Sequence, residues 1–384
     1  MPMPTNGGRT GKQKLNSTGE PVSLKQLAEY LGLNPATVSV VLNNVPGRSI
    51  PQPTRERIKA AAEKLGYQPN LLARSLRNRK THTIGILVPE LGEGYHTQVM
   101  SGIGDYLIGK GYFYFTVHHR HRKDLVEEYC NMLLSRGAEG LIAIDTLLEH
   151  KLPVPVVAVA GHTRVEGVTN LVLDHDRAAE LALTHLYSLG HRDMAYMRGQ
   201  PFSSDSDDRW RSTVKMARKL GLRVKPELVV RLERDITTPD LGYPVVQQLL
   251  NSNQRFTALV SFNDVAAMGA MRALQDVGLR VPTDVSVIGF DDIRAAAFIS
   301  PSLTTVRQPL REMGWMASEY LLARLQGVEK FREQIVIYPE LTVRESTAAV
   351  VHADDAPDSP RKPRRGAKNK DTSPRNRIAA LAKE

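Results

Sequence analysis

The sequence is poor in features that belong to secreted or membrane proteins. It contains one cysteine, Cys130, in 384 residues, which excludes an intrachain disulfide framework and suits a reducing compartment. No run of about 18 apolar residues is present, so no segment is expected to span a membrane. The first segment, residues 1–16, has no apolar stretch and does not resemble a signal peptide. We therefore expect a cytoplasmic protein without a membrane partner.

Sequence motifs of nucleotide-binding enzymes are also missing. An NAD-type enzyme needs the pattern GxGxxG between a strand and a helix. The nearest run, Gly102-Ile103-Gly104, has Leu107 where the third glycine belongs, and it lies inside a predicted helix. No Walker A sequence occurs. We therefore expect neither a dinucleotide nor a nucleoside triphosphate as a cofactor.

Histidines and carboxylates do not have the spacing of catalytic or metal sites. Three histidines follow one predicted strand without partner spacing for a metal, and we expect them to be solvated: His118, His119 and His121. Two pairs of adjacent aspartates point in different directions, which favours capping or cleft hydrogen bonds: Asp207-Asp208 and Asp291-Asp292. We therefore expect that the protein is not an enzyme and that it binds no cofactor and no metal.

Positive charge is concentrated at the two ends of the chain, whose formal net charge is +10. Residues 1–80 carry 13 Lys and Arg against 4 Asp and Glu, and residues 361–384 carry 9 against 2. The body between them is therefore acidic, with a net charge of −6. A basic head on an acidic body favours a head that binds a polyanion and a body that avoids DNA.

Residues 22–42, VSLKQLAEYLGLNPATVSVVL, predict two short helices joined by a tight turn. Ser23 and the glutamine three residues later form a capping box at the first helix. Gly32 can end that helix in a left-handed conformation, and Asn34 with Pro35 starts the second helix. This arrangement is typical of a helix-turn-helix, whose second helix enters the major groove of DNA. The alternative is an ordinary αα-hairpin.

After a third predicted helix, Arg55–Leu65 with Thr54 as its cap, the pattern of the sequence changes. From Thr83 onward, short apolar runs alternate with amphipathic helices. This alternation predicts parallel sheets covered by helices on both faces. About 260 residues is long for one such sheet, so we expect two similar lobes. The predicted strands are Ile84–Val88, Tyr112–Val117, Gly140–Ile144, Val154–Ala160, Asn170–Leu173, Met194–Met197, Leu228–Val230, Ala258–Phe262 and Val285–Phe290.

Together these segments resemble the lactose-repressor (LacI/GalR-type) family of bacterial transcription regulators, from Val22 to Arg344. In the head, the motifs are Pro35-Ala36-Thr37-Val38-Ser39, Leu42-Asn43-Asn44, Leu65-Gly66-Tyr67, Pro69-Asn70 and Ala73-Arg74-Ser75-Leu76. In the body, they are Leu189-Gly190-His191-Arg192, Asn263-Asp264, Gly269-Ala270, the run from Val281 to Asp292, and Pro301-Ser302-Leu303-Thr304-Thr305. Each motif is weak alone, but their number and order are specific.

The resemblance implies a multidomain chain, with an all-α helix-turn-helix headpiece and an α/β two-lobed core similar to periplasmic binding proteins. It also implies a homodimer that represses from a near-palindromic operator in double-stranded DNA, in the nucleoid-associated cytoplasm. A small molecule between the lobes would control DNA affinity. The alternative is a cytoplasmic solute-binding or sensor protein, which the basic headpiece disfavours.

The resemblance, together with the composition of the two chain ends, divides the chain into five segments. They are a disordered basic N-terminus (1–21), a helix-turn-helix domain (22–68), a hinge helix and linker (69–82), an effector-binding and dimerisation core (83–349) and a disordered basic tail (350–384).

The resemblance assigns the DNA contacts to the second helix and to the hinge. Thr37 and Ser39 can reach phosphates or bases through their hydroxyl groups. Val40 departs from the family, which usually has an arginine there, so the usual guanine contact in the half-site is in doubt. Leu76 matches the hinge leucine that wedges into the minor groove, and the alternative is that it packs on the core. The expected DNA-binding residues are Ser23, Pro35, Ala36, Thr37, Ser39, Val40, Asn43, Tyr67, Ala73, Arg74 and Leu76.

The effector site is expected where strands of the two lobes end opposite one another. Asn263 and Asp291 each follow a predicted strand, and Arg209 occupies the family's ligand-contacting arginine position. Carboxylate, amide and guanidinium groups suit a carbohydrate, either a sugar or a polyol. Two stretches depart from the family, Gly92–His96 and Ser212-Thr213, so the resemblance does not name the ligand. The expected effector-binding residues are His96, Asp145, Arg209, Asn263, Asp291 and Gln308.

Overall fold

The computed structural model describes residues 22–43, 48–68, 80–92, 94–161, 164–252, 254–328 and 330–350. The predicted N-terminal segment 1–21, the predicted hinge helix and the tail beyond residue 350 lie outside these described residues. Across the described parts of the chain, no helix has the length and hydropathy that a membrane span requires.

The headpiece contains the two helices that the sequence predicts, with the predicted caps. Ser23 accepts a hydrogen bond from the Gln26 amide, and the Gln26 side chain accepts one from the Ser23 amide, which completes the capping box. Asn34 caps the second helix by accepting a hydrogen bond from the Ala36 amide over 2.8 Å. The headpiece elements are α1 (Leu24–Leu31), α2 (Pro35–Leu42) and α3 (Gln52–Leu65).

The start of α3 differs from its prediction. The helix begins at Gln52 rather than at Arg55, and Pro51 occupies the N-cap position. Pro53 lies in the first turn, where its fixed φ suits a helix and its missing N–H is not needed. Thr54 is therefore inside the helix and is not its cap. The three helices meet in a small core whose fully buried side chains are Leu27, Val38, Val41 and Ile58.

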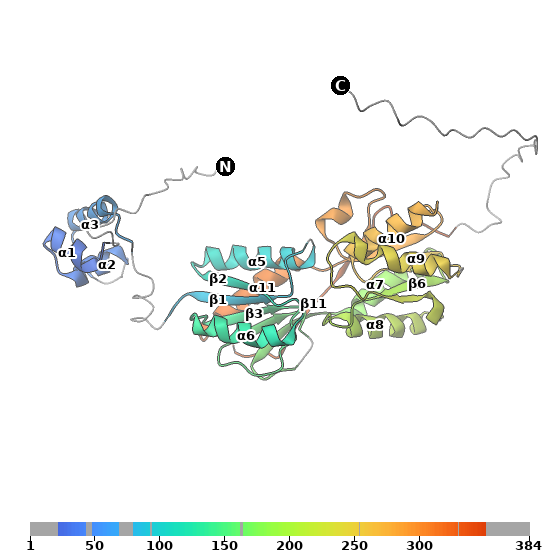
Figure 1. The fold of residues 1–384 in the computed structure, drawn as a ribbon, viewed down its shortest axis with the longest axis horizontal. Coiled ribbons are helices and arrows are strands. Elements are labelled where there is room, and N and C mark those ends of the chain that lie inside the picture. The colour runs from blue at the N-terminus through green and yellow to red at the C-terminus, as the bar shows by residue number, and fades with distance from the viewer. Residues whose placement is uncertain are drawn as a thin grey trace, which may run out of the picture.

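The body consists of two α/β lobes, as the alternating pattern predicts (Figure 1). The N-lobe contains an entirely parallel six-stranded sheet in the order β11-β5-β4-β3-β1-β2. Its elements are β1 (Thr83–Val88), α5 (Tyr95–Gly109), β2 (Phe113–His118), α6 (Lys123–Ser135), β3 (Gly140–Ile144), β4 (Val156–Val159), β5 (Val168–Leu173), α11 (Leu310–Leu325) and β11 (Gln334–Ile337).

The C-lobe contains a second six-stranded sheet in the order β12-β10-β9-β8-β6-β7. Its strands are parallel except for β12, which pairs antiparallel with β10. Its elements are α7 (His175–Ser188), β6 (Met194–Arg198), α8 (Ser206–Lys219), β7 (Val229–Arg231), α9 (Tyr243–Asn251), β8 (Ala258–Val260), α10 (Asp264–Asp276), β9 (Ser286–Asp291), β10 (Thr304–Arg307) and β12 (Glu340–Thr342), with short 3₁₀ turns at Pro226–Leu228, Pro239–Leu241 and Arg294–Ala297.

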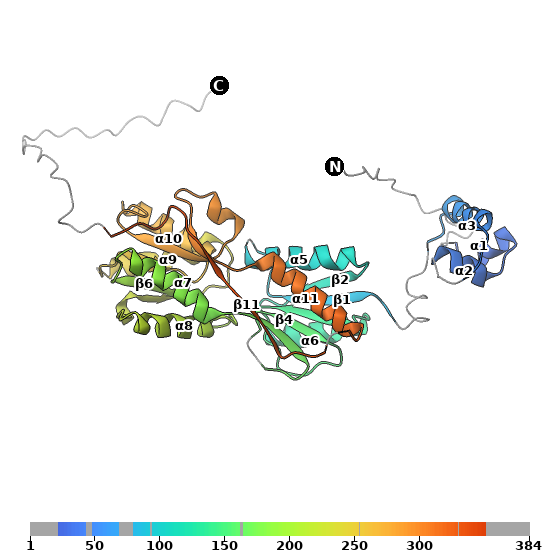
Figure 2. The same cartoon turned by 180° about the vertical axis from the view of Figure 1, so that it is seen from behind.

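Three connections join the lobes, because the chain passes between them after β5, after β10 and after β11. Figure 2 shows α11 packed on the N-lobe although it follows the C-lobe strands in sequence. The sequence predicts the other nine strands but not β10, β11 or β12. β11 and β12 pair with strands that are distant in sequence, whereas β10 pairs with the preceding strand β9 and with β12.

The glycines of the run Gly102-Ile103-Gly104 lie inside α5, as expected, and one of them allows close helix packing. A Cβ atom at Gly102 would lie 1.9 Å from the Arg311 carbonyl oxygen of α11. A Cβ atom at Gly314 of α11 would lie 2.0 Å from the Val99 carbonyl oxygen of α5. The two helices therefore cross with their backbones in contact, which only glycine permits at these positions.

Candidate functional site

The exposed surface of α2 is where the sequence predicts base contacts. Pro35 and Ala36 are exposed, and Thr37 and Val40 are half-buried. Val40 can therefore offer only an apolar surface, such as a thymine methyl group would contact. Ser23 is exposed beside this helix pair, whereas Tyr67 is half-buried against the headpiece core.

Ser39 was expected near solvent, and the structure corrects this. Its side chain is 7% exposed. The Nδ2 group of Asn43 donates a hydrogen bond to the Ser39 carbonyl oxygen over 2.7 Å and to the Ser39 hydroxyl over 3.2 Å. These two hydrogen bonds stabilise the C-terminal end of α2. Three further predicted DNA contacts, Ala73, Arg74 and Leu76, lie outside the described residues.

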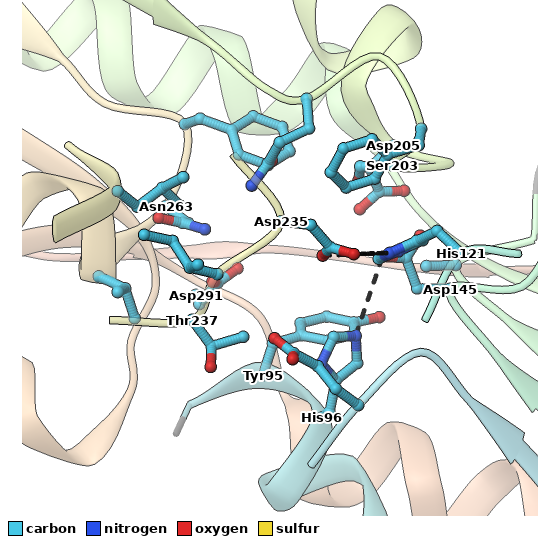
Figure 3. A pocket seen from close by; sticks show the side chains of 18 of the residues that line it. Tyr95, His96, His121, Asp145, Ser203, Asp205, Asp235, Thr237, Asn263 and Asp291 are labelled. Atoms are coloured by element: carbon cyan, nitrogen blue, oxygen red, sulfur yellow. Dashed lines mark hydrogen bonds and ion pairs between the residues drawn. The ribbon is translucent and has the colours of Figure 1, made fainter. Parts of the chain in front are cut away.

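A cavity lies between the lobes at the carboxyl ends of their parallel strands (Figure 3). We call its two polar sides the N-lobe wall and the C-lobe wall. The N-lobe wall consists of Glu90, Tyr95, His96, His121 and Asp145, and the C-lobe wall of Asp205, Arg209, Asp235, Asn263 and Asp291.

The backbone is unusual where strands lead into the cavity. Four non-glycine residues there have φ in the left-handed region, namely His121 (53°), Asp145 (43°), Ala160 (57°) and Asp291 (113°). Each ends a strand or follows one. Such conformations cost free energy for residues with a Cβ atom and cluster at functional sites. The backbone is therefore strained at the strand ends that line the cavity, as is common at functional sites.

Asp145 links the two lobes. Its Oδ1 accepts hydrogen bonds from the amide and the hydroxyl of Ser204 in the C-lobe, over 2.9 and 2.6 Å. Its Oδ2 lies 3.8 Å from His96 Nε2 and 3.7 Å from His121 Nε2. Burial works against the charge, but the two imidazoles and Ser204 outweigh it and lower the pKa of Asp145. This carboxylate is therefore ionised inside the cavity.

His121 also bridges the lobes, because its Nδ1 lies 3.3 Å from the Asp235 carboxylate (Figure 3). Burial alone would lower the pKa of His121, but Asp145 and Asp235 outweigh burial and raise it. His121 is thus shared between one carboxylate of each wall.

Arg209 is held by two hydrogen bonds and two aromatic rings. Its Nη2 donates to Asp205 over 2.8 Å and its Nη1 donates to the Phe262 carbonyl oxygen over 2.6 Å. The guanidinium lies 3.6 Å from the ring centroid of Phe290 and 4.4 Å from that of Phe262. Within the described residues, its Nε has no hydrogen-bond partner. The C-lobe wall is therefore built around an immobilised cation.

Asp291 is a buried carboxyl group, 5% exposed, at the end of β9. Burial raises the pKa of Asp291 to about 7, although Arg209 and the hydrogen bond from Gln308 oppose this. The Gln308 Nε2 donates to Asp291 Oδ1 over 2.7 Å. Behind it, burial and the charge of Asp291 raise the pKa of Asp264, which accepts hydrogen bonds from Thr305 and the Ile293 amide. Asp291 is therefore close to its titration midpoint at neutral pH.

Comparisons with known proteins agree with this architecture. Residues 23–70 match bacterial regulatory proteins of the lacI family, and residues 183–347 match a periplasmic binding protein-like domain. The transcriptional repressor PurR of Erwinia tasmaniensis is 31% identical over 335 residues, which cover 85% of this chain and 97% of PurR. The chain belongs to the lacI family. It is a DNA-binding transcriptional repressor with a ligand-binding core.

Two solved structures of lacI-family regulators show the same fold. A Lac repressor dimer bound to operator and the anti-inducer ONPF superimposes with a TM-score of 0.77 at 26% identity, covering 86% of this chain and 100% of the repressor. The complex of the regulator CelR with cellobiose superimposes with a TM-score of 0.61 at 26% identity, covering 85% of this chain and 99% of CelR.

In this lacI-family repressor, the structure brings most predicted effector residues together. The predicted residues that line the cavity are His96, Asp145, Arg209, Asn263 and Asp291. Gln308 is the exception, because it is 3% exposed and lies behind Asp291 as its hydrogen-bond donor. Asn263 uses its side-chain oxygen to cap α10 by accepting from the Ala266 amide, so its Nδ2 is the group that can donate to a ligand.

Five residues of the walls were not predicted, namely Glu90, Tyr95, His121, Asp205 and Asp235. The expectation that three histidines are solvated holds only for His118, which is exposed. His119 is 1% exposed, and its Nε2 lies 2.8 Å from the Thr146 hydroxyl. The rule that residues after strands face the cleft would have found Glu90 and His121. Among the described residues, no three His, Cys, Asp or Glu side chains have the geometry of a metal site.

Proposed function

We propose that a polyhydroxylated small molecule, a sugar or a polyol, binds between the two walls and controls the operator affinity of this repressor. The observation that carries this proposal is the cavity itself, whose polar groups come from both lobes. Asn263 can donate a hydrogen bond there, and Asp145 and Asp291 can accept from hydroxyl groups. The complex of CelR with cellobiose shows that a related regulator binds a sugar.

A ligand can change operator affinity only if it binds one arrangement of the lobes more tightly than another. In this cavity, contacts between the lobes already exist without a ligand, from Asp145 to Ser204 and from His121 to Asp235. A ligand that contacts both walls stabilises the arrangement in which the two lobes close around it, and does not stabilise an open arrangement in the same way. The proposed function therefore needs no catalytic step.

We further propose that the repressor acts as a cytoplasmic homodimer on a near-palindromic operator, as the Lac repressor dimer binds its operator. Strand β2 lies at the edge of the N-lobe sheet and exposes two aromatic rings. Phe113 is 61% exposed and Phe115 is 37% exposed, and their rings contact each other at 5.1 Å. A second copy of the chain would cover this apolar edge.

The DNA-binding part of the proposal is tested by selecting binding sites from random duplexes with the full chain. We expect a nearly palindromic consensus and an affinity that falls steeply with salt, because the basic head neutralises phosphates. A chain that lacks residues 1–80 should keep a folded core and lose specific binding. Operator affinity that survives this deletion would contradict the headpiece assignment.

The orientation of α2 is tested by repeating the selection with Val40→Arg. An arginine that reaches a base edge should enrich a guanine in each half-site, a preference worth about 1–3 kcal/mol for a bidentate contact. Lys25→Arg, an exposed change on α1, is the matched control and should leave the consensus unchanged. If Val40→Arg returns the wild-type consensus, position 40 does not face the bases.

A further inference from the structure

The cavity contains more carboxylates than the protein neutralises. The carboxylates on its walls are Glu90, Asp145, Asp205, Asp235 and Asp291. Arg209 is the one guanidinium or ammonium group among the described residues of the two walls, and its charge is taken by Asp205 at 2.8 Å. The imidazoles of His96 and His121 are the other possible cations of the walls, and His175 contacts Asp205 at 3.3 Å from outside them. Five carboxylates thus face at most four cations, so the cavity is acidic even when all three imidazoles are protonated.

The histidines are already shared among carboxylates of both walls. His121 contacts Asp145 and Asp235, and His96 faces Asp145 as well. One carboxylate of each wall is then left without a neutralising cation, Glu90 in the N-lobe and Asp291 in the C-lobe. The raised pKa of Asp291 has this origin, because burial and its carboxylate neighbours outweigh the charge of Arg209.

Several polar atoms of the N-lobe wall have no hydrogen-bond partner within the described residues. They include Glu90 Oε1 and the Tyr95 hydroxyl, which are buried. His96 Nε2 and His121 Nε2 also lack a hydrogen bond, but they face the Asp145 carboxylate at 3.8 and 3.7 Å. Buried polar groups are normally satisfied, so unpartnered atoms that line a cavity indicate where a ligand binds. Tyr95, Phe202 and Phe262 add aromatic surface to the same cavity, which favours a cation over an anion.

Resting on the function proposed above, we propose that the effector carries a protonated amine on its hydroxyl-bearing skeleton, and that this ammonium binds among the carboxylates of Glu90 and Asp291. An ammonium group supplies three donors and one positive charge, which are what this cavity lacks. A carboxylate or phosphate on the ligand would instead lie among like charges with reduced solvent screening. A neutral sugar would satisfy hydroxyl contacts and leave the excess charge in place.

The test uses the full chain and matched sets of compounds that differ in one group. The sets are glucosamine, glucose and glucuronate; galactosamine, galactose and galacturonate; and glucamine, sorbitol and gluconate. Binding is measured by calorimetry and by the shift in melting temperature, at a pH at which the amines are protonated. We expect the amine of at least one set to bind tenfold or more tightly than its neutral partner, and the acid to bind most weakly.

A variant that removes one negative charge tests whether the N-lobe wall binds the amine. Glu90→Gln keeps the shape of the side chain and should weaken amine binding tenfold or more, with less than threefold effect on the neutral partner. Glu127→Gln, an exposed change on α6, is the matched control and should alter neither affinity. Equal losses for amine and neutral compound in Glu90→Gln would show that Glu90 contributes shape or hydrogen bonding and would overturn its role.

The amine proposal and the proposed function fail in different ways. Amines that bind no better than their neutral partners, including a panel in which nothing binds, overturn the amine proposal. If a neutral sugar binds and changes operator affinity, effector control stands and the amine proposal falls. If an amine binds tightly but leaves affinity for the selected operator unchanged, the ligand class stands and effector control falls.

Discussion

The two walls of the cavity differ in how far the protein has already satisfied their polar groups. In the C-lobe wall, Arg209 is held by Asp205 and two aromatic rings, and Asn263 caps a helix. In the N-lobe wall, Glu90 Oε1 and the Tyr95 hydroxyl are buried without a hydrogen-bond partner among the described residues, and in the C-lobe wall Arg209 Nε is. The difference indicates that the C-lobe wall is held more fully by contacts within the fold, whereas the N-lobe wall keeps more polar atoms that a ligand of the proposed kind could bind.

The largest expected effect comes from the centre of the C-lobe wall. Arg209→Ala should lower the free energy of unfolding by about 3–5 kcal/mol, because it leaves the buried Asp205 carboxylate without its guanidinium partner. Arg211→Ala on the same helix removes an exposed ion pair to Asp208 and should cost less than about 0.5 kcal/mol. Chemical denaturation followed by circular dichroism measures both. Similar small losses would show that the C-lobe wall does not support the fold.

Asp291→Asn should do the opposite and stabilise the protein. Between pH 4 and 7 the folded Asp291 holds a proton that the unfolded chain releases near its ordinary pKa, so wild-type stability falls as pH rises through this window. Asparagine removes that penalty and tolerates the positive φ of 113°. The expected gain is about 1–3 kcal/mol above pH 7, shrinking as the pH falls.

Asp292→Asn is the matched control for this prediction. Asp292 accepts a hydrogen bond from Arg344 over 2.6 Å, so neutralising it should destabilise the protein at neutral pH. Thermal unfolding of both variants across a pH series gives the answer. A loss of stability in Asp291→Asn that does not depend on pH would show that its carboxylate is ionised and well paired.

A smaller effect is expected where the walls touch. The pKa of His121 is raised above its unfolded value, so its ion pairs stabilise the protein fully below about pH 6.5 and are lost as the pH rises through the folded value. When the pH rises to 8, the free energy of unfolding of wild type should therefore fall by up to about 1 kcal/mol relative to that of His121→Gln. His118→Gln, an exposed change after the same strand, should show no such difference in thermal unfolding. A pH-independent difference would remove His121 from the contact between lobes.

The smallest expected change in stability concerns an unpartnered hydroxyl group of the N-lobe wall. Tyr95→Phe removes a hydroxyl that has no partner within the described residues, so stability should change by less than about 0.5 kcal/mol. Tyr320→Phe in α11 removes a hydroxyl that donates to the Lys330 carbonyl oxygen over 2.6 Å and should cost about 1 kcal/mol. Denaturant titrations of the two variants measure the contrast. An equal cost for Tyr95→Phe would mean that its hydroxyl is satisfied within the protein.

The sequence predicts residues of both walls, including His96 and Asp145 in the N-lobe wall. Arg209, Asn263 and Asp291 were assigned to the cavity because they match family motifs or follow predicted strands, and all three lie in the C-lobe wall. Part of the N-lobe wall comes from the stretch Gly92–His96, where the chain departs from the family, and part from the loop after β2. Tyr95 acquires its position from tertiary packing, whereas His121 follows a predicted strand and could have been found by that rule.

The fold was predictable to a similar degree. Strand–helix alternation and capping residues act locally, so the headpiece helices and nine strands follow from the sequence. β11 and β12 were missed because they are short and partly exposed, and because their pairing partners lie far away in sequence. Gln308 was assigned to the ligand site, but it acts behind Asp291, a distinction that depends on side-chain packing.

The most direct test of the account is operator affinity with and without a cavity ligand, in wild type and in Asp291→Asn. Fluorescence anisotropy on the selected operator is measured with the compound from the amine, neutral and acid sets that stabilises wild type most. We expect a change of tenfold or more in the operator affinity of wild type. We also expect that Asp291→Asn binds the operator like wild type without the compound and fails to respond to it. An unchanged wild-type affinity at saturating compound, or operator binding lost in Asp291→Asn without it, would contradict the account.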